Sequence, residues 1–200
     1  MARGAQYPGA ASRRRRSQEP PSTGAAAVDA EPDPESVARA IALRLLTGAP
    51  RSRAQLEEAM ARRDVPEDVA ARVLDRFTEV GLVDDAEYAR MLVRTRHAER
   101  GLSRRAIAVE LRRRGIDEES ASAALEQVDA DDEEQAARHL VRRKLASTAG
   151  LDTQTRLRRV VGALGRKGYA PSLVLRLARE ELAAEGDDAS SDDGDWSPAD

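Results

Sequence analysis

Carboxylate pairs and histidines are the side chains of this sequence that could take part in catalysis or bind a metal ion. The clearest acidic pairs are Asp84-Asp85 and Asp131-Asp132, and the two histidines are His97 and His139. Each acidic pair stands at the expected start of a helix, where a carboxylate accepts backbone N–H bonds and opposes the positive end of the helix dipole. Both histidines fall inside amphipathic stretches, which predicts surface or boundary positions. We therefore predict structural roles for these residues, with no catalytic site, no metal site and no cofactor.

Other catalytic and targeting signals are missing from the sequence. There is no cysteine, so a disulfide framework and thiolate metal ligands are excluded. We find no glycine-rich phosphate loop and no nucleophile elbow. No run of about 18 apolar residues predicts a membrane-spanning helix, and no apolar segment follows the arginines near the N-terminus as in a secretory signal. We expect a cytoplasmic protein that is not an enzyme.

A stronger signal comes from two arginine-rich stretches. Residues 90–116 hold nine arginines and two acids, and residues 138–169 hold seven arginines and two lysines against one acid. Guanidinium groups suit phosphate oxygens, and several such contacts give salt-dependent binding to nucleic acid or nucleoprotein. The alternative is that these faces are only solvated, because arginine is abundant throughout the chain. The candidate contact residues are Arg94, Arg104, Arg105, Arg112, Arg113, Arg142, Arg143, Arg158, Arg159, Arg166 and Lys167.

Short helices must position these side chains. Apolar residues recur at helical spacing, and capping residues mark where each helix begins. Ser52 is the predicted N-cap of the second helix of the chain. In the middle of the chain, the predicted N-caps of three consecutive helices are Asp84 or Asp85, then Ser103 and then Asp117. A further round begins at the Asp131-Asp132 pair. The predicted units are residues 33–81, 82–129 and 130–185, flanked by a basic tail (1–32) and an acidic tail (186–200) that we expect to be disordered.

These units align with one another as internal repeats of roughly 50 residues. Leu56 aligns with Ile107 and Val160 on the inward face of each second helix. An apolar residue also follows each second helix, where it would tether the turn to the core: Val65, Ile116 and Tyr169. Such short units cannot bury much surface alone, so they stack on their neighbours. The sequence predicts an all-α fold of three tandem three-helix repeats in an elongated, curved array.

The middle unit carries motifs that resemble the signature of the bacterial RecX family. They read GLVDDAEYA over residues 81–89, RGLS over 100–103 and ELRRRGI over 110–116. The third unit lacks the G-L-x-D-D start, and the first has Val37 where the second has Tyr88. The resemblance covers about residues 34–184 and implies the same three-unit fold. The signature positions, for which it implies structural roles, are Gly81, Asp84, Asp85, Tyr88, Ala89, Leu111 and Gly115.

The resemblance also implies a function. RecX proteins bind in the helical groove of the RecA–DNA filament and inhibit strand exchange, ATP hydrolysis and co-protease activity. From this we expect a monomeric regulator in DNA repair, recombination and the SOS response. Its expected partner is the RecA filament, with single- or double-stranded DNA as a further candidate at the basic faces.

Two other functions remain open from the residues alone. A stand-alone helix-turn-helix protein would place residues 103–114 in the major groove. Arg104 and Arg105 are present at the start of that helix, but no Asn or Gln accompanies them for base recognition. The third possibility is a helical scaffold for other proteins.

Overall fold

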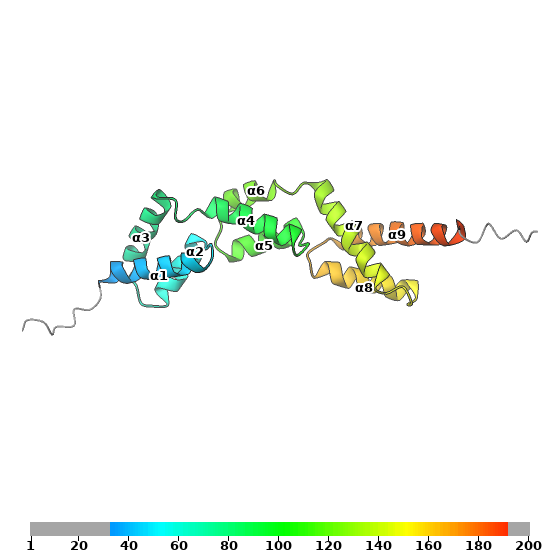
Figure 1. Cartoon of the computed structure of the whole chain (residues 1–200), viewed down its shortest axis with the longest axis horizontal. Helices are drawn as coiled ribbons and strands as arrows, with labels where there is room; N and C mark the ends of the chain where they lie inside the picture. Colours follow the sequence, from blue (N-terminus) through cyan, green and yellow to red (C-terminus); the bar gives the residue numbers. More distant parts are fainter. Residues whose placement is uncertain (1–32, 192–200) are drawn as a thin grey trace, which may run out of the picture. The chain divides into compact units, whose positions relative to one another are not determined.

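The computed structural model describes residues 33–191, and side chains up to residue 185. The predicted basic tail and residues 192–200 of the predicted acidic tail lie outside the described residues. Within the described part the fold is entirely helical, as the sequence predicts (Figure 1). Three consecutive sets of three helices each enclose a separate apolar core.

The first unit contains α1 (Pro34–Gly48), α2 (Arg53–Ala61) and α3 (Glu67–Glu79). The predicted N-cap of α2 is confirmed, because the Ser52 side chain accepts the Gln55 N–H and the Gln55 side chain accepts the Ser52 N–H. This reciprocal capping box satisfies two N–H groups that the helix itself leaves unpaired. All three helices pack on one another around the largest core side chains: Leu56, Met60, Leu74 and Phe77.

The second unit contains α4 (Asp85–Ala98), α5 (Arg104–Arg113) and α6 (Glu118–Leu125). Asp84, Ser103 and Asp117 are the N-caps of these helices, in agreement with the predicted boundaries. The inward face of α5 is formed by Ile107 and Leu111, which are fully buried.

The third unit contains α7 (Ala130–Ala146), α8 (Thr153–Gly165) and α9 (Pro171–Ser191). The predicted start of α7 at Asp131 or Asp132 is wrong. Asp129 is the N-cap, because its carboxylate accepts the Asp132 N–H at 2.7 Å and the Asp132 side chain accepts the Asp129 N–H in return. Helix α9 continues past the predicted start of the acidic tail, because Gly186 lies within the helix and does not end it.

Each unit closes its second helix with the same tethered turn. The predicted tethering residues Val65, Ile116 and Tyr169 are all buried. The residue before each of them has a positive φ: 58° at Asp64, 75° at Gly115 and 91° at Gly168. In this left-handed conformation the chain leaves the helix and returns to the core.

A joint connects the first unit to the second. The Ser52 hydroxyl donates to the Arg114 carbonyl oxygen at 2.6 Å, and Asp85 Oδ1 accepts the Arg53 N–H at 2.8 Å. The start of α2 therefore packs on the turn after α5. Burial raises the pKa of the Asp85 carboxyl at this contact.

An equivalent joint connects the second unit to the third. The Ser103 N–H donates to the Lys167 carbonyl oxygen at 3.0 Å, and Glu133 Oε1 accepts the Arg104 N–H at 2.9 Å. The start of α5 thus packs on the turn after α8. Both joints use the serine that caps the second helix of one unit and a carboxylate from the first helix of the next.

The joints also explain why two of the three tethered turns contain glycine. A Cβ on Gly115 would overlap the Ala54 side chain, and a Cβ on Gly168 would overlap the Ser103 hydroxyl. The equivalent residue of the first unit is Asp64, and no unit precedes it in the described chain. A side chain is therefore tolerated at this position only where no earlier unit packs on it.

The joint residues are replaced at two positions that take part in no joint: the start of the first unit and the second helix of the third unit. Pro34 occupies the position of the carboxylates Asp85 and Glu133. Helix α8 begins one turn earlier than α2 and α5, so Arg156 stands where they have a serine. Arg156 is buried, donates to the Leu145 carbonyl oxygen at 3.2 Å and forms an ion pair of 2.8 Å with Glu185.

Candidate filament and nucleic-acid interface

Most of the predicted contact residues lie on the surface of the second and third units. Arg104 and Lys167 are half-buried at the second joint. The remaining candidates are exposed: Arg94, Arg105, Arg112, Arg113, Arg142, Arg143, Arg158, Arg159 and Arg166.

Ion pairs within the chain divide these candidates into two groups. Arg94 contacts Glu87 at 3.2 Å, and Arg142 contacts Glu181 at 2.6 Å. Both guanidinium groups are thereby partly neutralised before any partner binds. None of the other nine candidates forms an ion pair with a residue of the described chain. These unpaired cations are the better candidates for contact with an external anion.

Counting arginines along the sequence overestimated the free positive charge of the second unit. Glu110, on α5, accepts hydrogen bonds from Arg96 at 2.9 Å and from Arg114 at 2.8 Å. The two arginines lower the pKa of the Glu110 carboxyl, with Arg96 as the larger cause. Arg114 also contacts the hydroxyl of buried Tyr88. Because these groups hold α4 against α5, Arg96 and Arg114 stabilise the unit and do not belong to the candidate surface.

A second network holds the third unit together. Arg138, on α7, forms ion pairs with Glu180 at 2.7 Å and Glu181 at 3.0 Å, both on α9. Arg176, also on α9, reaches back to Glu134 on α7 at 2.5 Å. These contacts raise the pKa of Arg138. They also lower the pKa of the Glu180 carboxyl, and the hydrogen bond from Arg138 is the largest cause of that lowering. Part of the predicted basic stretch is therefore used to join α7 to α9.

The signature residues of the second unit have local structural contacts. The Asp84 carboxylate accepts the Glu87 N–H at 2.8 Å as the N-cap of α4. Tyr88, Ala89 and Leu111 are buried in the core. Gly81 follows α3 with a φ of 72°, a conformation that favours glycine.

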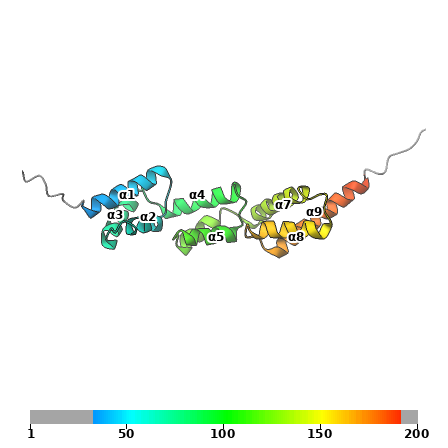
Figure 2. The same cartoon turned by 90° about the horizontal axis from the view of Figure 1, so that it is seen from below.

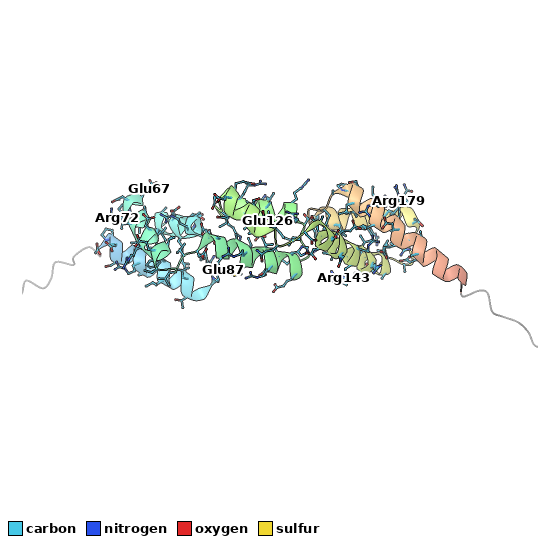
Figure 3. The ribbon with its side chains drawn as sticks, turned by 90° about the horizontal axis from the view of Figure 1, so that it is seen from above. Glu67, Arg72, Glu87, Glu126, Arg143 and Arg179 are labelled. Carbon is cyan, nitrogen blue, oxygen red and sulfur yellow. The ribbon has the colours of Figure 1, made fainter. Side chains whose placement is uncertain are left out.

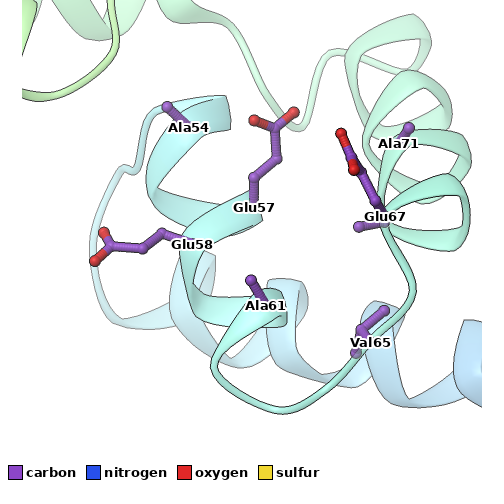
Figure 4. Close-up of a pocket in the computed structure, with 8 residues that line it drawn as sticks. Ala54, Glu57, Glu58, Ala61, Val65, Glu67 and Ala71 are labelled. Atoms are coloured by element: carbon purple, nitrogen blue, oxygen red, sulfur yellow. The ribbon is translucent and has the colours of Figure 1, made fainter.

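Acidic side chains do not form a metal site in the part of the chain that the structure describes. A hollow of about 460 Å³ between α2 and α3 is lined by Glu57, Glu58 and Glu67 (Figure 4). Glu57 is paired with Arg53 at 2.9 Å, and alanines and Val65 form the rest of the lining. The hollow brings no nucleophile or general base next to these carboxylates. Among the described helices, none is long and apolar enough to cross a membrane.

One groove brings several cations together at the second joint. A hollow of about 600 Å³ is lined by Arg100, Arg143 and Lys167, and by both histidines. Arg143 and Lys167 were among the sequence candidates, whereas Arg100 and the two histidines were not. The alignment of the units offered a signal for Arg100, since it stands in the loop that leads to the joint serine.

Comparisons with known proteins follow the same division into three units. Models of the first, second and third three-helix domains of RecX match residues 38–77, 84–125 and 131–177. Together these matches cover more than half of the chain. The chain belongs to the RecX family. The fold and the family that the sequence predicts are thereby confirmed.

Relatives in this family are similar over most of their length. The regulatory protein RecX of Thermobifida fusca is 57% identical over 149 residues, which are 74% of this chain and 80% of that protein. The regulatory protein RecX of Streptomyces coelicolor is 51% identical over 156 residues, covering 78% of this chain and 83% of the relative. That of Mycobacterium ulcerans is 46% identical over 169 residues, covering 84% and 94%.

Solved structures share the fold. A crystal structure of RecX from Lactobacillus salivarius superposes with a TM-score of 0.66 at 21% identity, covering 74% of this chain and 96% of that one. A second crystal structure of a regulatory protein RecX gives a TM-score of 0.64 at 24% identity, covering 74% and 72%. At these identities the comparison supports the three-unit fold and carries no residue roles.

Proposed function

We propose that this chain is a non-catalytic regulator that docks on the RecA–DNA filament and inhibits its recombinase, ATPase and co-protease activities. The names of the relatives support a regulatory role. The structural observation that carries the proposal is a set of exposed arginines on the second and third units that form no ion pair with another described residue: Arg105, Arg112, Arg113, Arg143, Arg158, Arg159 and Arg166.

Charge explains why these residues suit a filament. Other arginines of the same units, such as Arg96 and Arg138, form ion pairs with carboxylates of the chain, and these pairs hold the helices of a unit together. The unpaired arginines have none, and guanidinium groups bind carboxylates and phosphates through paired hydrogen bonds. A RecA–DNA filament presents both kinds of anion.

The stand-alone helix-turn-helix alternative has less support from the geometry. Recognition helices contact base edges through their N-terminal residues. The N-terminus of α5 lies at the second joint, where the buried Ser103 and the Arg104 N–H bind the third unit. The start of α5 would have to leave this joint before it could enter a major groove.

The test is a titration of the protein into RecA filaments while ATP hydrolysis is measured. The variant is Arg105→Glu with Arg112→Glu, because both side chains are exposed and lie on one side of α5. Arg63→Glu with Arg179→Glu is the matched control, because both arginines are exposed and have no ion pair with a described residue. Figure 3 shows Arg179 on α9, at the opposite edge of the third unit from Arg143.

We expect the wild type and the control to inhibit hydrolysis, and the α5 variant to need at least about tenfold more protein, equivalent to about 1.4 kcal/mol. Absence of inhibition by the wild type would refute the proposed function. Equal inhibition by all three proteins would refute this choice of surface. Sequence-selective binding to bare duplex with no effect on RecA would favour the helix-turn-helix alternative.

A further inference from the structure

Helix α8 presents a basic face that no described part of the chain covers. The helix packs on α7 and α9 through its buried side chains. On the opposite side, Arg158, Arg159 and Arg166 are exposed around Gly162, at helical spacing. A Cβ added at Gly162 would meet only Arg166 Nη1, at 3.8 Å, so the middle of this side is open. We call these four residues the basic face of α8.

The described carboxylates leave the arginines of the basic face unpaired. None of the three forms an ion pair with a described residue. The neighbouring helix α9 does carry acids, but Glu180 and Glu181 pair with Arg138, and Glu185 pairs with Arg156. The acids of α9 are thus engaged away from the basic face.

The chain returns to the start of α8 just before its acidic end. Helix α9 runs back along α8, and the Glu185 carboxylate lies 2.8 Å from the guanidinium of Arg156, in the first turns of α8. After Glu185 the sequence holds six aspartates and no basic residue. Four of these aspartates fall in residues 192–200, which lie outside the described residues. Acidic chain therefore follows directly from a point that is anchored beside α8.

The acidic segment is long enough to cover the basic face. Helix α9 continues from Glu185 to Ser191, which is about 9 Å at 1.5 Å per residue. Residues 192–200 span up to about 30 Å when extended. Along α8, Arg156 and Arg166 are about 15 Å apart. A segment that turns back at the end of α9 needs about 24 Å to pass Arg156 and reach Arg166, which is within its length.

An apolar contact point lies at the same end of α8. Leu151 is 37% exposed and directly precedes Asp152, the N-cap of α8. Among the described residues of the third unit, it is the one exposed large apolar residue. The N–H of Thr155 is the main cause that lowers the pKa of Asp152, and the charge of Arg158 adds to it, which places Arg158 near this loop. Trp196, the only tryptophan of the chain, stands among the C-terminal aspartates and is a suitable anchor for such a point.

We propose that the acidic C-terminal segment, residues 192–200, docks on the basic face of α8 in the same molecule. Its aspartates pair with the three arginines, since guanidinium groups bind carboxylates through charge-assisted hydrogen bonds. Trp196 packs against Leu151. Because the segment is tethered beside α8, its effective concentration there is on the order of 1 mM. The same arginines belong to the set proposed for filament contact, so the segment would have to leave before a filament binds; this consequence alone rests on the proposed function.

The fluorescence of Trp196 reports the contact directly, because the full chain has no other tryptophan. The experiment measures its emission maximum and its quenching by acrylamide, with neither DNA nor RecA present. The variant is Arg158→Gln with Arg159→Gln. The matched control, Arg112→Gln with Arg113→Gln, removes two adjacent exposed arginines of α5 that also form no ion pair with a described residue. A synthetic peptide of residues 186–200 gives the fully exposed reference, and circular dichroism verifies that the variants are folded.

We expect Trp196 in the wild type and in the control to emit at shorter wavelength than in the peptide. A segment docked half of the time lowers the quenching constant about twofold relative to the peptide. Raising the salt from about 0.1 M to about 1 M shortens the Debye length from about 10 Å to about 3 Å and should release the segment. The basic-face variant should match the peptide already at low salt. Leu151→Ser should do the same, because Trp196 loses its apolar contact.

Four results would overturn the inference. The first is equal quenching of the wild type and the peptide. The second is equal loss of shielding in the basic-face variant and the control, because any loss of positive charge would then suffice. The third is shielding that persists at about 1 M salt, where exposed charges are screened. The fourth is shielding that grows over about a hundredfold range of protein concentration, which would place the segment on a second copy.

Discussion

Replacing Gly115 with alanine tests whether the first joint depends on close contact between units. Gly115 has a φ of 75°, and an added Cβ would overlap the Ala54 side chain of the preceding unit. The left-handed conformation costs a residue with a Cβ about 1–2 kcal/mol. Overpacking costs about 1–3 kcal/mol more, because the obstructing Ala54 Cβ is attached directly to the α2 backbone and cannot rotate away.

A second glycine separates these two costs. Gly81 has a φ of 72°, and an added Cβ there meets no atom within 4 Å. Gly81→Ala should therefore lower the free energy of unfolding only by the conformational cost, about 1–2 kcal/mol. Gly115→Ala should lower it by about 2–5 kcal/mol in total. Opening the joint would also weaken the 2.6 Å hydrogen bond from the Ser52 hydroxyl to the Arg114 carbonyl oxygen, part of the same loss.

The assay is urea unfolding of the full chain, followed by circular dichroism, for the wild type and each variant. A double variant, Ala54→Gly with Gly115→Ala, removes the obstructing methyl group. Measured beside Ala54→Gly alone, it should be at least about 1 kcal/mol more stable than the sum of the two single losses predicts. Equal destabilisation by Gly81→Ala and Gly115→Ala, within about 0.5 kcal/mol, would refute the proposed role of the joint. So would a double variant in which the two losses simply add.

Three further predictions concern the cores and the buried polar groups. Leu111→Asp should unfold the second unit, because Leu111 is fully buried and the new carboxylate would have no partner; a wild-type melting curve would contradict this. Glu110→Gln should cost about 1–3 kcal/mol at neutral pH by weakening the bond to Arg96. Since the folded pKa of Glu110 is lowered from 4.5, wild-type stability should fall as acid titrates the group, and the variant should lose less stability between about pH 5 and pH 3 in urea unfolding. Tyr169→Phe should leave stability unchanged or raise it by up to about 1 kcal/mol, because the buried hydroxyl has no hydrogen-bond partner in the described chain; a loss above that size would reveal one.

Local signals made the helices predictable. Ser52, Ser103 and Asp117 each combine a side chain that accepts a backbone N–H with an apolar helical pattern that follows directly, so their helices begin where expected. The start of α7 was harder to locate, because Asp129, Asp131 and Asp132 can all cap a helix. Val128, which is buried in the core of the second unit, directly precedes Asp129 and fixes where the chain enters α7.

Contacts between distant residues could not be predicted in the same way. Arg138 and Arg143 belong to the same basic stretch of the sequence. Arg138 pairs with Glu180 and Glu181 on α9, whereas Arg143 lines the hollow of about 600 Å³ at the second joint. Which arginine remains free depends on which side of α7 meets α9, and helical periodicity alone does not give the neighbour of a polar face. Arg94 and Arg142 of the predicted contact set thus already have carboxylate partners, and Arg100, which is outside that set, lines the same hollow as Arg143.

The two joints separate the geometry of the array from its surface chemistry. At each joint, N–H and hydroxyl groups at the start of one helix donate to a backbone carbonyl oxygen and to a carboxylate of the next unit. Figure 2 shows the helices of the units that the two joints connect. These contacts use mainly backbone atoms and glycine, so the side chains around them are free to vary without loss of the joint. The first joint accordingly has Leu46 and Met91 where the second has His97 and His139. One repeated joint can thus carry different linings along the chain, so a protein built from copies of one unit presents different chemistry along its surface.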